Sequence, residues 1–183
     1  MANRSYLYTH HTGEEPEYRD VSEWKGIAPI SHLLLAGANP TVRTSAIWEV
    51  KEKIAIQGDA GPARNLFLEF LDWLKPQLPQ GFHEASEEAK ELLTRPNRQG
   101  AFFQLELGEV YELLGLELDE MEPETESNAV LAKELFVEVR RLIGTQGATL
   151  KDATHEKIRA IADHWEEELG LYFPGINYFH LGK

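Results

Sequence analysis

The sequence predicts a mainly α-helical α+β fold, with one compact helical domain over residues 1–183 that carries two or three short strands. Apolar residues recur at helical spacing over several segments, whereas only three short segments have β-favouring composition. The length of 183 residues fits one domain, and a hydrophobic fraction of 42% is enough for a buried core. Several helices and few strands in one chain are typical of an α+β domain.

The predicted strands lie near the two ends of the chain and at its centre. Residues 4–9 are short and aromatic, and residues 101–107 read AFFQLEL, so each is expected to form a strand. Between them, residues 10–20 are polar and predict a surface loop. A third strand is expected over 177–181, paired with either of the first two.

The helices are predicted from apolar spacing and from the residues at their ends. Pro29 and Gly37 frame a short helix over Ile30–Ala36, for which a buried strand is the alternative. Ser45 is expected to cap a helix over Ala46–Ile56. The most apolar segment, and therefore the expected central helix, is 62–75. Further helices are expected over residues 86–94, 109–114, 123–143 and 152–169.

Charge is concentrated in one part of the chain. Of the net charge of −13, residues 101–150 contribute −8, from eleven acidic and three basic residues. Such a field repels nucleic acid and anionic membranes, so neither is expected as a partner. The predicted protein-binding residues are the acids of this stretch, Glu106, Glu109, Glu112, Glu117, Asp119, Glu120, Glu122, Glu124 and Glu126.

The acidic stretch is expected to be held in place rather than to float. Leucines alternate with its acids from Leu105 to Leu118, which anchors that part in the core. Only Asp119–Ser127 has the composition of a free loop. Trp24, in the segment SEWKG, is added to the predicted interface because interfaces favour exposed aromatic residues.

The residues that carry enzyme chemistry do not form a recognisable pattern. The chain has no cysteine and no nucleophile-elbow motif, and Gly58–Gly61 lacks the lysine of a phosphate-binding loop, so Asp59 is expected to cap a helix. His164 has metal-compatible spacing to Glu167 or Glu168, but a solvated helix face is the better interpretation. No catalytic residue, metal or cofactor is therefore predicted.

Two further features concern the location of the protein. The longest apolar run, around Ile27–Ala38, is too short to span a bilayer. The first fifteen residues contain no apolar segment typical of a secretory signal. A cytoplasmic location is expected.

Several short segments resemble a family of small uncharacterised bacterial proteins. They are MANRSYLY at 1–8, SEW at 22–24, GANP at 37–40, SAIW at 45–48 and KIAIQGD at 53–59, with a weaker likeness in LELGEVYEL at 105–113. This resemblance implies no catalytic residues. In size, acidity and lack of catalytic motifs, the chain is also similar to the immunity proteins that bacteria pair with toxins, which is an analogy of general character.

The resulting hypothesis is a non-enzymatic immunity protein that binds and neutralises a cognate protein toxin through the acidic surface. A toxin with a basic cleft is the expected partner. One alternative is a carboxylate-based enzyme or a metal-binding protein that uses the acids and His164. Another is a structural protein that forms homo-oligomers through the aromatic tail, which contains Tyr172, Tyr178 and Phe179.

Overall fold

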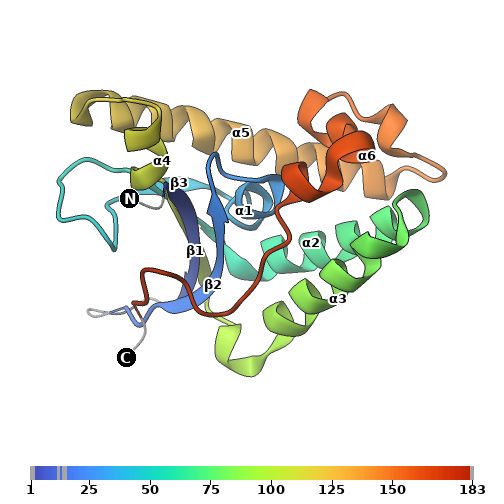
Figure 1. Ribbon diagram of the computed structural model, residues 1–183, viewed down its shortest axis with the longest axis horizontal. Helices are drawn as coiled ribbons and strands as arrows, with labels where there is room; N and C mark the ends of the chain where they lie inside the picture. Colours follow the sequence, from blue (N-terminus) through green and yellow to red (C-terminus); the bar gives the residue numbers. More distant parts are fainter. Residues whose placement is uncertain (1–2, 12, 14–15, 182–183) are drawn as a thin grey trace.

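A five-stranded antiparallel sheet forms the centre of the protein, in a computed structural model that describes residues 3–11, 13 and 16–181. The strand order is β2-β1-β5-β4-β3, and every neighbouring pair is antiparallel (Figure 1). The strands are β1 (Arg4–His10), β2 (Arg19–Lys25), β3 (Thr41–Arg43), β4 (Ala55–Asp59) and β5 (Phe102–Glu106).

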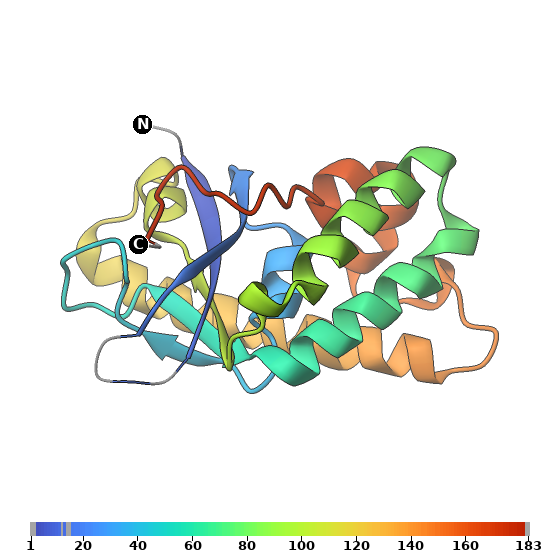
Figure 2. The same ribbon diagram turned by 90° about the horizontal axis from the view of Figure 1, so that it is seen from below.

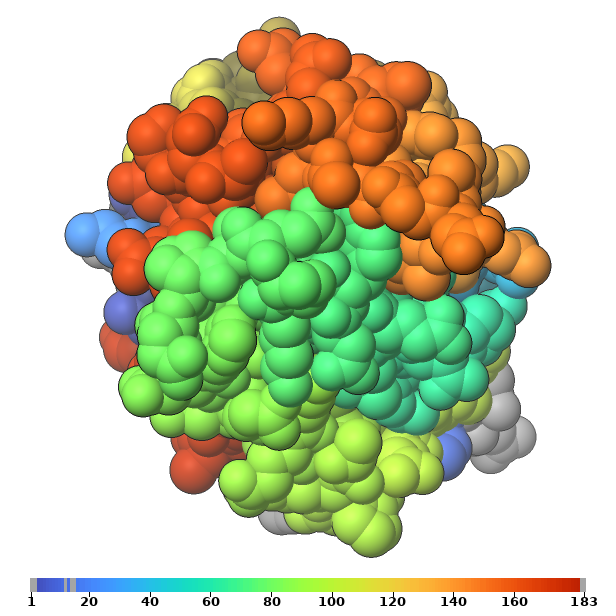
Figure 3. Space-filling view, turned by 90° about the vertical axis from the view of Figure 1, so that its right-hand side faces the viewer, coloured from blue at the N-terminus to red at the C-terminus, as the bar shows by residue number. Residues whose placement is uncertain are grey.

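Helices cover one face of this sheet, which we call the inner face, and extend beyond it. They are α1 (Ile30–Leu35), α2 (Ala60–Leu74), α3 (Gln80–Thr94), α4 (Gly108–Leu113), α5 (Leu118–Gly144) and α6 (Glu156–Leu169). Short 3-10 turns lie at Lys75–Gln77, Pro96–Arg98 and Leu150–Asp152. Helices α1, α2 and α5 contact the strands, and α2, α3 and α6 form the far end of the molecule (Figures 2 and 3).

The prediction of a mainly helical fold with two or three short strands is wrong, because the described residues form one sheet of five strands. Strands β2, β3 and β4 were not predicted. In β2 the polar residues Asp20, Ser22 and Glu23 are all buried, so the strand does not alternate between apolar and polar residues. An irregularity in its pairing with β1, between Leu7 and Tyr8, disturbs the pattern further.

The helix predicted over Ala46–Ile56 is also wrong. The side-chain oxygen of Ser45 does accept hydrogen bonds from the backbone N–H of Ile47 and of Trp48, as a helix-capping serine would. The turn that it caps does not continue as a helix, and strand β4 begins at Ala55. The local capping signal was therefore correct, but the chain after this turn leads into strand β4 of the sheet and not into a helix.

The strand predicted over 177–181 does not form. Its proposed partners are β1, which lies between β2 and β5, and β5, which lies between β1 and β4, so neither has a free edge. The tail instead crosses the other face of the sheet, the outer face (Figure 2). It is held there by individual hydrogen bonds, from Tyr8 Oη to the Phe179 carbonyl (2.6 Å) and from Asn177 Nδ2 to the Leu7 carbonyl (3.2 Å).

The loop predicted at Asp119–Ser127 is helical, because α5 begins at Leu118 and not at Pro123. The carboxylate of Glu120 accepts a hydrogen bond from the backbone N–H of Glu117 at 2.9 Å, as part of a capping box. Acidic side chains in the first turn also complement the positive end of the helix dipole. The acidic composition of Asp119–Ser127, which resembles that of a loop, is therefore the composition of the start of a helix.

Other helix predictions are confirmed, with shifted ends. The segment Ile30–Leu35 is a helix and not a strand, and the apolar segment around residues 62–75 forms the central helix α2. Helix α3 begins at Gln80, earlier than the predicted residue 86, and α6 ends at Gly170 in the left-handed conformation (φ 58°).

Helix α1 is the most enclosed element, since all six of its residues are buried. Two glycines allow this packing. A Cβ added to Gly58 of β4 would lie 2.3 Å from the carbonyl oxygen of Ala36, and one added to Gly37 would lie 2.5 Å from that of Ala132 in α5. The end of α1 thus packs backbone to backbone between the sheet and α5, where any side chain would collide.

A buried histidine joins α1 to the sheet. His32 is fully buried, with Nε2 at 2.8 Å from Ser22 Oγ on β2 and Nδ1 at 3.0 Å from Ser5 Oγ on β1. Because the Ser22 hydroxyl donates its proton to the carbonyl of Tyr172, Ser22 Oγ accepts from His32, which places the ring proton on Nε2. Ser5 then donates to Nδ1. Burial lowers the pKa of His32 to about 3, so the ring is neutral.

Within the described part of the chain, none of the helices combines the length and apolarity that crossing a bilayer requires.

His32 should make stability depend on pH. Its pKa is lower in the folded state than in the unfolded state, so its contribution is complete above pH 6.5 and is lost as the pH falls toward 3. Between pH 7.5 and 5, this one group should cost about 2 kcal/mol of unfolding free energy. Urea unfolding at both pH values measures the decrease in unfolding free energy between pH 7.5 and 5. This decrease should be smaller in His32→Gln than in wild type, whatever the absolute stability of the variant. The control His164→Gln alters an exposed residue and should show the same decrease as wild type. Equal losses in wild type and His32→Gln would contradict the assignment.

Candidate functional site

The nine acids of the predicted interface do not share one environment. Glu112, Glu117, Asp119, Glu120 and Glu126 are exposed, and Glu122 and Glu124 are half-buried. Glu106 and Glu109 are buried, with 1% and 3% of their surface exposed. The structure therefore brings seven of the nine to the surface, along α4 and the first turns of α5, and the other two serve inside the protein.

Glu106 fixes the irregular segment between β3 and β4. Its carboxylate accepts hydrogen bonds from Ser45 Oγ (2.6 Å), the Ala46 backbone N–H (2.9 Å) and Gln104 Nε2 (2.6 Å). Burial raises the pKa of Glu106, and these three donors oppose the shift. The carboxylate is thus an internal acceptor that holds a loop against the sheet.

Glu109 and Glu122 hold other parts of the backbone. The Glu109 carboxylate accepts from the backbone N–H of Arg4 at 2.8 Å, which attaches α4 to the start of β1. Glu122 accepts from the backbone N–H of Lys53 at 3.2 Å and forms an exposed ion pair with its ammonium group at 3.9 Å. These contacts attach the acidic region to the start of β1 and to the segment before β4.

The exposed part of this region combines acids with leucines, and we call it the acidic–leucine surface: Glu112, Leu113, Leu114, Glu117, Leu118, Asp119 and Glu120. It covers the end of α4 and the start of α5 (Figure 1). Its three leucines expose 47%, 52% and 42% of their area. Among the described residues, none of its four acids forms an ion pair. It therefore presents negative charge without ion pairs next to exposed apolar side chains.

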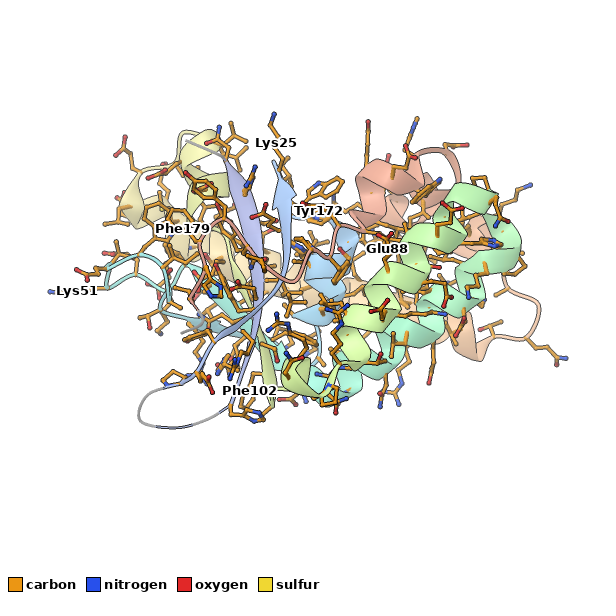
Figure 4. All side chains as sticks on the ribbon, turned by 60° about the horizontal axis from the view of Figure 1, so that its bottom comes forward. Lys25, Lys51, Glu88, Phe102, Tyr172 and Phe179 are labelled. Carbon is orange, nitrogen blue, oxygen red and sulfur yellow. The ribbon has the colours of Figure 1, made fainter. Side chains whose placement is uncertain are left out.

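Trp24 lies away from that surface. It is half-buried on the edge strand β2, beside Gly170 and close to Lys25 and Tyr172, in a shallow cavity of about 290 Å³. Lys25 and Tyr172 are near each other at one edge of the sheet in Figure 4. The sequence grouped Trp24 with the acids, and the fold separates them.

His164, which the sequence analysis considered as a metal ligand, lies in an irregular part of α6. His164 is exposed and has non-helical backbone angles (φ −138°, ψ 43°) inside α6, so regular helical spacing to Glu167 and Glu168 does not apply. Over the residues that the structure describes, no group of three or more His, Asp or Glu side chains is placed to hold a metal ion.

A polar groove on the outer face of the sheet was not predicted as a site. We call it the His10 groove. It has a volume of about 580 Å³ and lies at the end of the sheet next to the β1–β2 connection. Its main lining residues are His10, Tyr18, Gln57, Asp59, Phe102 and Gln104. The signal in the sequence that could have located it is the alternation of Tyr6, Tyr8 and His10 along one side of β1.

A protein-family comparison matches residues 6–164 to the Domain of unknown function (DUF7822). The chain belongs to the DUF7822 family. That region runs from within β1 into α6, so it includes the sheet except for the first two residues of β1, and it includes the acidic–leucine surface. Comparisons with curated proteins and with solved structures gave no significant match.

Apart from MANRSYLY at 1–8, which begins before it, the resemblance segments lie within the matched region, and four of them supply structural contacts. SEW supplies Ser22 to the His32 network, and GANP supplies Gly37, where α1 meets α5. SAIW supplies Ser45 to Glu106, and KIAIQGD contains Gly58. These four residues each join separate elements of the fold.

The two kinds of acid should respond differently to the same substitution. Glu106→Gln replaces one acceptor oxygen by an N–H₂ group that faces other donors, so it should lower the unfolding free energy by about 1–3 kcal/mol. Glu112→Gln changes an exposed residue and should stay within about 0.5 kcal/mol of wild type. Urea denaturation of both variants checks this, and equal stabilities would contradict the role of Glu106.

Proposed function

We propose that this DUF7822 protein is a non-enzymatic binding protein of the immunity type, which neutralises a protein toxin through the acidic–leucine surface. The partner would present a basic cleft with an apolar floor, and a cytoplasmic location belongs to the same proposal. The observation that carries it is the group of three exposed leucines that stand next to exposed acids along the chain, on α4 and the start of α5, where none of the four acids has an ion pair among the described residues. Interfaces combine an apolar centre with a polar rim in this way.

The attachment of the surface to neighbouring elements supports the proposal. Glu109 attaches α4 to β1, Glu120 caps α5, and Glu122 holds the segment before β4. A surface that is already ordered loses less conformational entropy on binding than a loop would. The sequence predicted a fixed surface up to Leu118, and the helical start of α5 extends it.

The electrostatic part of the proposal also follows from the arrangement of charge. Four acids lie within nine residues of one another, on α4 and the start of α5. A concentrated negative surface accelerates encounters with a basic partner and orients it. This contribution weakens as salt screens the exposed charges.

Charge reversal should slow association. The probe is the product of the gene next to that of this protein, which is where bacterial toxin–immunity pairing would place the toxin. Glu112→Lys and Asp119→Lys in the acidic–leucine surface, together with Glu126→Lys further along α5, should lower the association rate constant about tenfold at low salt, with a smaller effect at high salt. Glu117 and Glu120 are left intact because their capping box supports α5. Surface plasmon resonance measures both rate constants.

The matched control reverses the same amount of charge elsewhere. Glu69→Lys, Glu84→Lys and Glu88→Lys alter exposed acids on α2 and α3, and Figure 4 shows Glu88 on α3, away from the sheet. This variant should associate at close to the wild-type rate. Equal slowing by both triple variants, or binding that is indifferent to salt and to both, would reject the acidic–leucine surface as the docking site.

The leucines should control how long the complex lasts. Leu113→Ser with Leu114→Ser removes apolar area at the centre of the surface, so the dissociation rate constant should rise about tenfold or more while the fold is retained. Ile176→Ser, which alters a 69% exposed residue of the tail, is the control and should leave dissociation unchanged. A wild-type dissociation rate in the leucine variant would show that the centre of the interface lies elsewhere.

A further inference from the structure

Helix α5 has a buried apolar stripe and, on another side, two exposed valines. The buried stripe includes Leu135, Val139 and Leu142, which pack into the core. Val130 and Val137 instead expose 58% and 57% of their area. Residues seven apart lie almost above one another on an α-helix, so these two valines form a short line along the surface of α5. The helix runs along one side of the molecule in Figure 1.

The two valines lie in an open groove, which we call the α5 groove. It has a volume of about 610 Å³ and is lined by residues of α5, among them Val130, Lys133, Glu134 and Val137, and by Thr154 and His155, which precede α6. The carboxylate of Glu138 accepts from the backbone N–H of Thr154 at 2.6 Å, so the segment beside the groove is attached to α5. An apolar groove along a helix suits the packing of another helix.

The charge along α5 changes from one end of the groove to the other. Residues 118–129 contain five acids and no base, whereas residues 130–144 contain three bases and two acids. Glu126 and Arg140 are exposed, and neither forms an ion pair with another described residue. An acid thus precedes the two valines and a base follows them.

The spacing of these residues fits a two-fold axis. Glu126 and Arg140 are centred on Lys133, and the two valines are centred between Lys133 and Glu134. A second α5 that ran antiparallel about this point would bring each Val130 next to Val137 of the other copy. It would also bring each Glu126 next to Arg140. Both contacts would occur twice, because a two-fold interface repeats every pair.

The positions around the helix agree with this axis. At about 100° per residue, Glu126 and Arg140 lie on the same flank of the line of valines. A two-fold rotation sets each flank of one helix against the same flank of the other, so the acid and the base can meet. Lys133 and Glu134 lie at the axis and have opposite charges, so they add no net charge there.

We propose that a second copy of this chain covers the α5 groove, in a two-fold dimer with antiparallel α5 helices. The observation that selects this occupant is the order of charge, since the chain itself supplies the reversed order that the groove requires. A parallel copy would set Glu126 against Glu126 and Arg140 against Arg140, which repel. The contact is narrow, so the dissociation constant should lie in the micromolar range. This proposal does not depend on the proposed function.

The direct test is analytical ultracentrifugation of the whole protein without a partner. Wild type should change from monomer to dimer as its concentration rises through the micromolar range. Val130→Asp with Val137→Asp should stay monomeric over the same range, because a buried carboxylate without a partner opposes the contact. Ile27→Asp, which alters a 62% exposed residue outside α5, is the control and should dimerise as wild type does. A wild type that stays monomeric up to millimolar concentration, or a valine variant that dimerises normally, would overturn the proposal.

Charge exchange tests the antiparallel arrangement. Arg140→Glu places two acids at each end of the contact, and Glu126→Arg places two bases there, so each variant alone should dimerise about tenfold more weakly. An equimolar mixture of the two variants should recover the wild-type affinity, because each end then holds one acid and one base. The chain with both substitutions should recover it as well. Undiminished dimers in the single variants, or no recovery in the mixture, would reject the arrangement.

The absence of cysteine from the sequence allows a second measurement of the register. Lys133→Cys places a thiol near its own counterpart at the axis, so a short bis-maleimide should link two copies rapidly. Ser127→Cys lies further along the helix, where antiparallel copies are about 19 Å apart, and should react slowly. Equal cross-linking of both variants, or none at Lys133→Cys, would contradict the two-fold axis.

Discussion

The enclosure of α1 is the constraint on which the rest of the structure depends. A six-residue helix with no exposed residue has little stability of its own, so its contacts must come from every neighbouring element. Gly37 and Gly58 allow the backbones of α1, α5 and β4 to meet, and His32 joins α1 to β1 and β2 through two hydroxyl groups. Because Ser22 also donates to Tyr172, the same network reaches the tail. Sheet, helices and tail are thereby fixed to one point.

Buried carboxylates hold the irregular segments in place. Glu106 holds the segment before β4, and Asp20 and Glu23 accept from the backbone N–H groups of Asn177 and Tyr178 in the tail. On the opposite side, Glu138 bonds Arg141 and the backbone of Thr154, and its pKa is lowered to about 2, chiefly by the Arg141 guanidinium. Acidic residues in this protein thus have two separate uses, as internal acceptors and as exposed charge.

This division explains why the candidate site was only partly predictable. The sequence located the acids and leucines of α4 and α5, but charge composition alone does not distinguish Glu106, which is buried, from Glu112, which is exposed. Glu106 is buried because the segment before β4 covers its side of β5, whereas Glu112 lies on an uncovered side of α4. The His10 groove was not predictable for the same reason, since its lining joins three strands that are distant in sequence. Strand register, and not local pattern, creates it.

What the sequence determined by itself were the features with strong local causes: the central helix α2, the short helix α1 between Pro29 and Gly37, the end of α6 at Gly170, and the strands β1 and β5. Each depends on apolar spacing or on the conformational preference of proline or glycine at its ends. The tertiary structure decided the number of strands, the place of the tail and the fate of the segment after Ser45. Those outcomes depend on which backbone groups are already paired. β5 is paired with β1 on one edge and with β4 on the other, and β1 is paired with β2 and β5, so neither strand has a free edge for the tail.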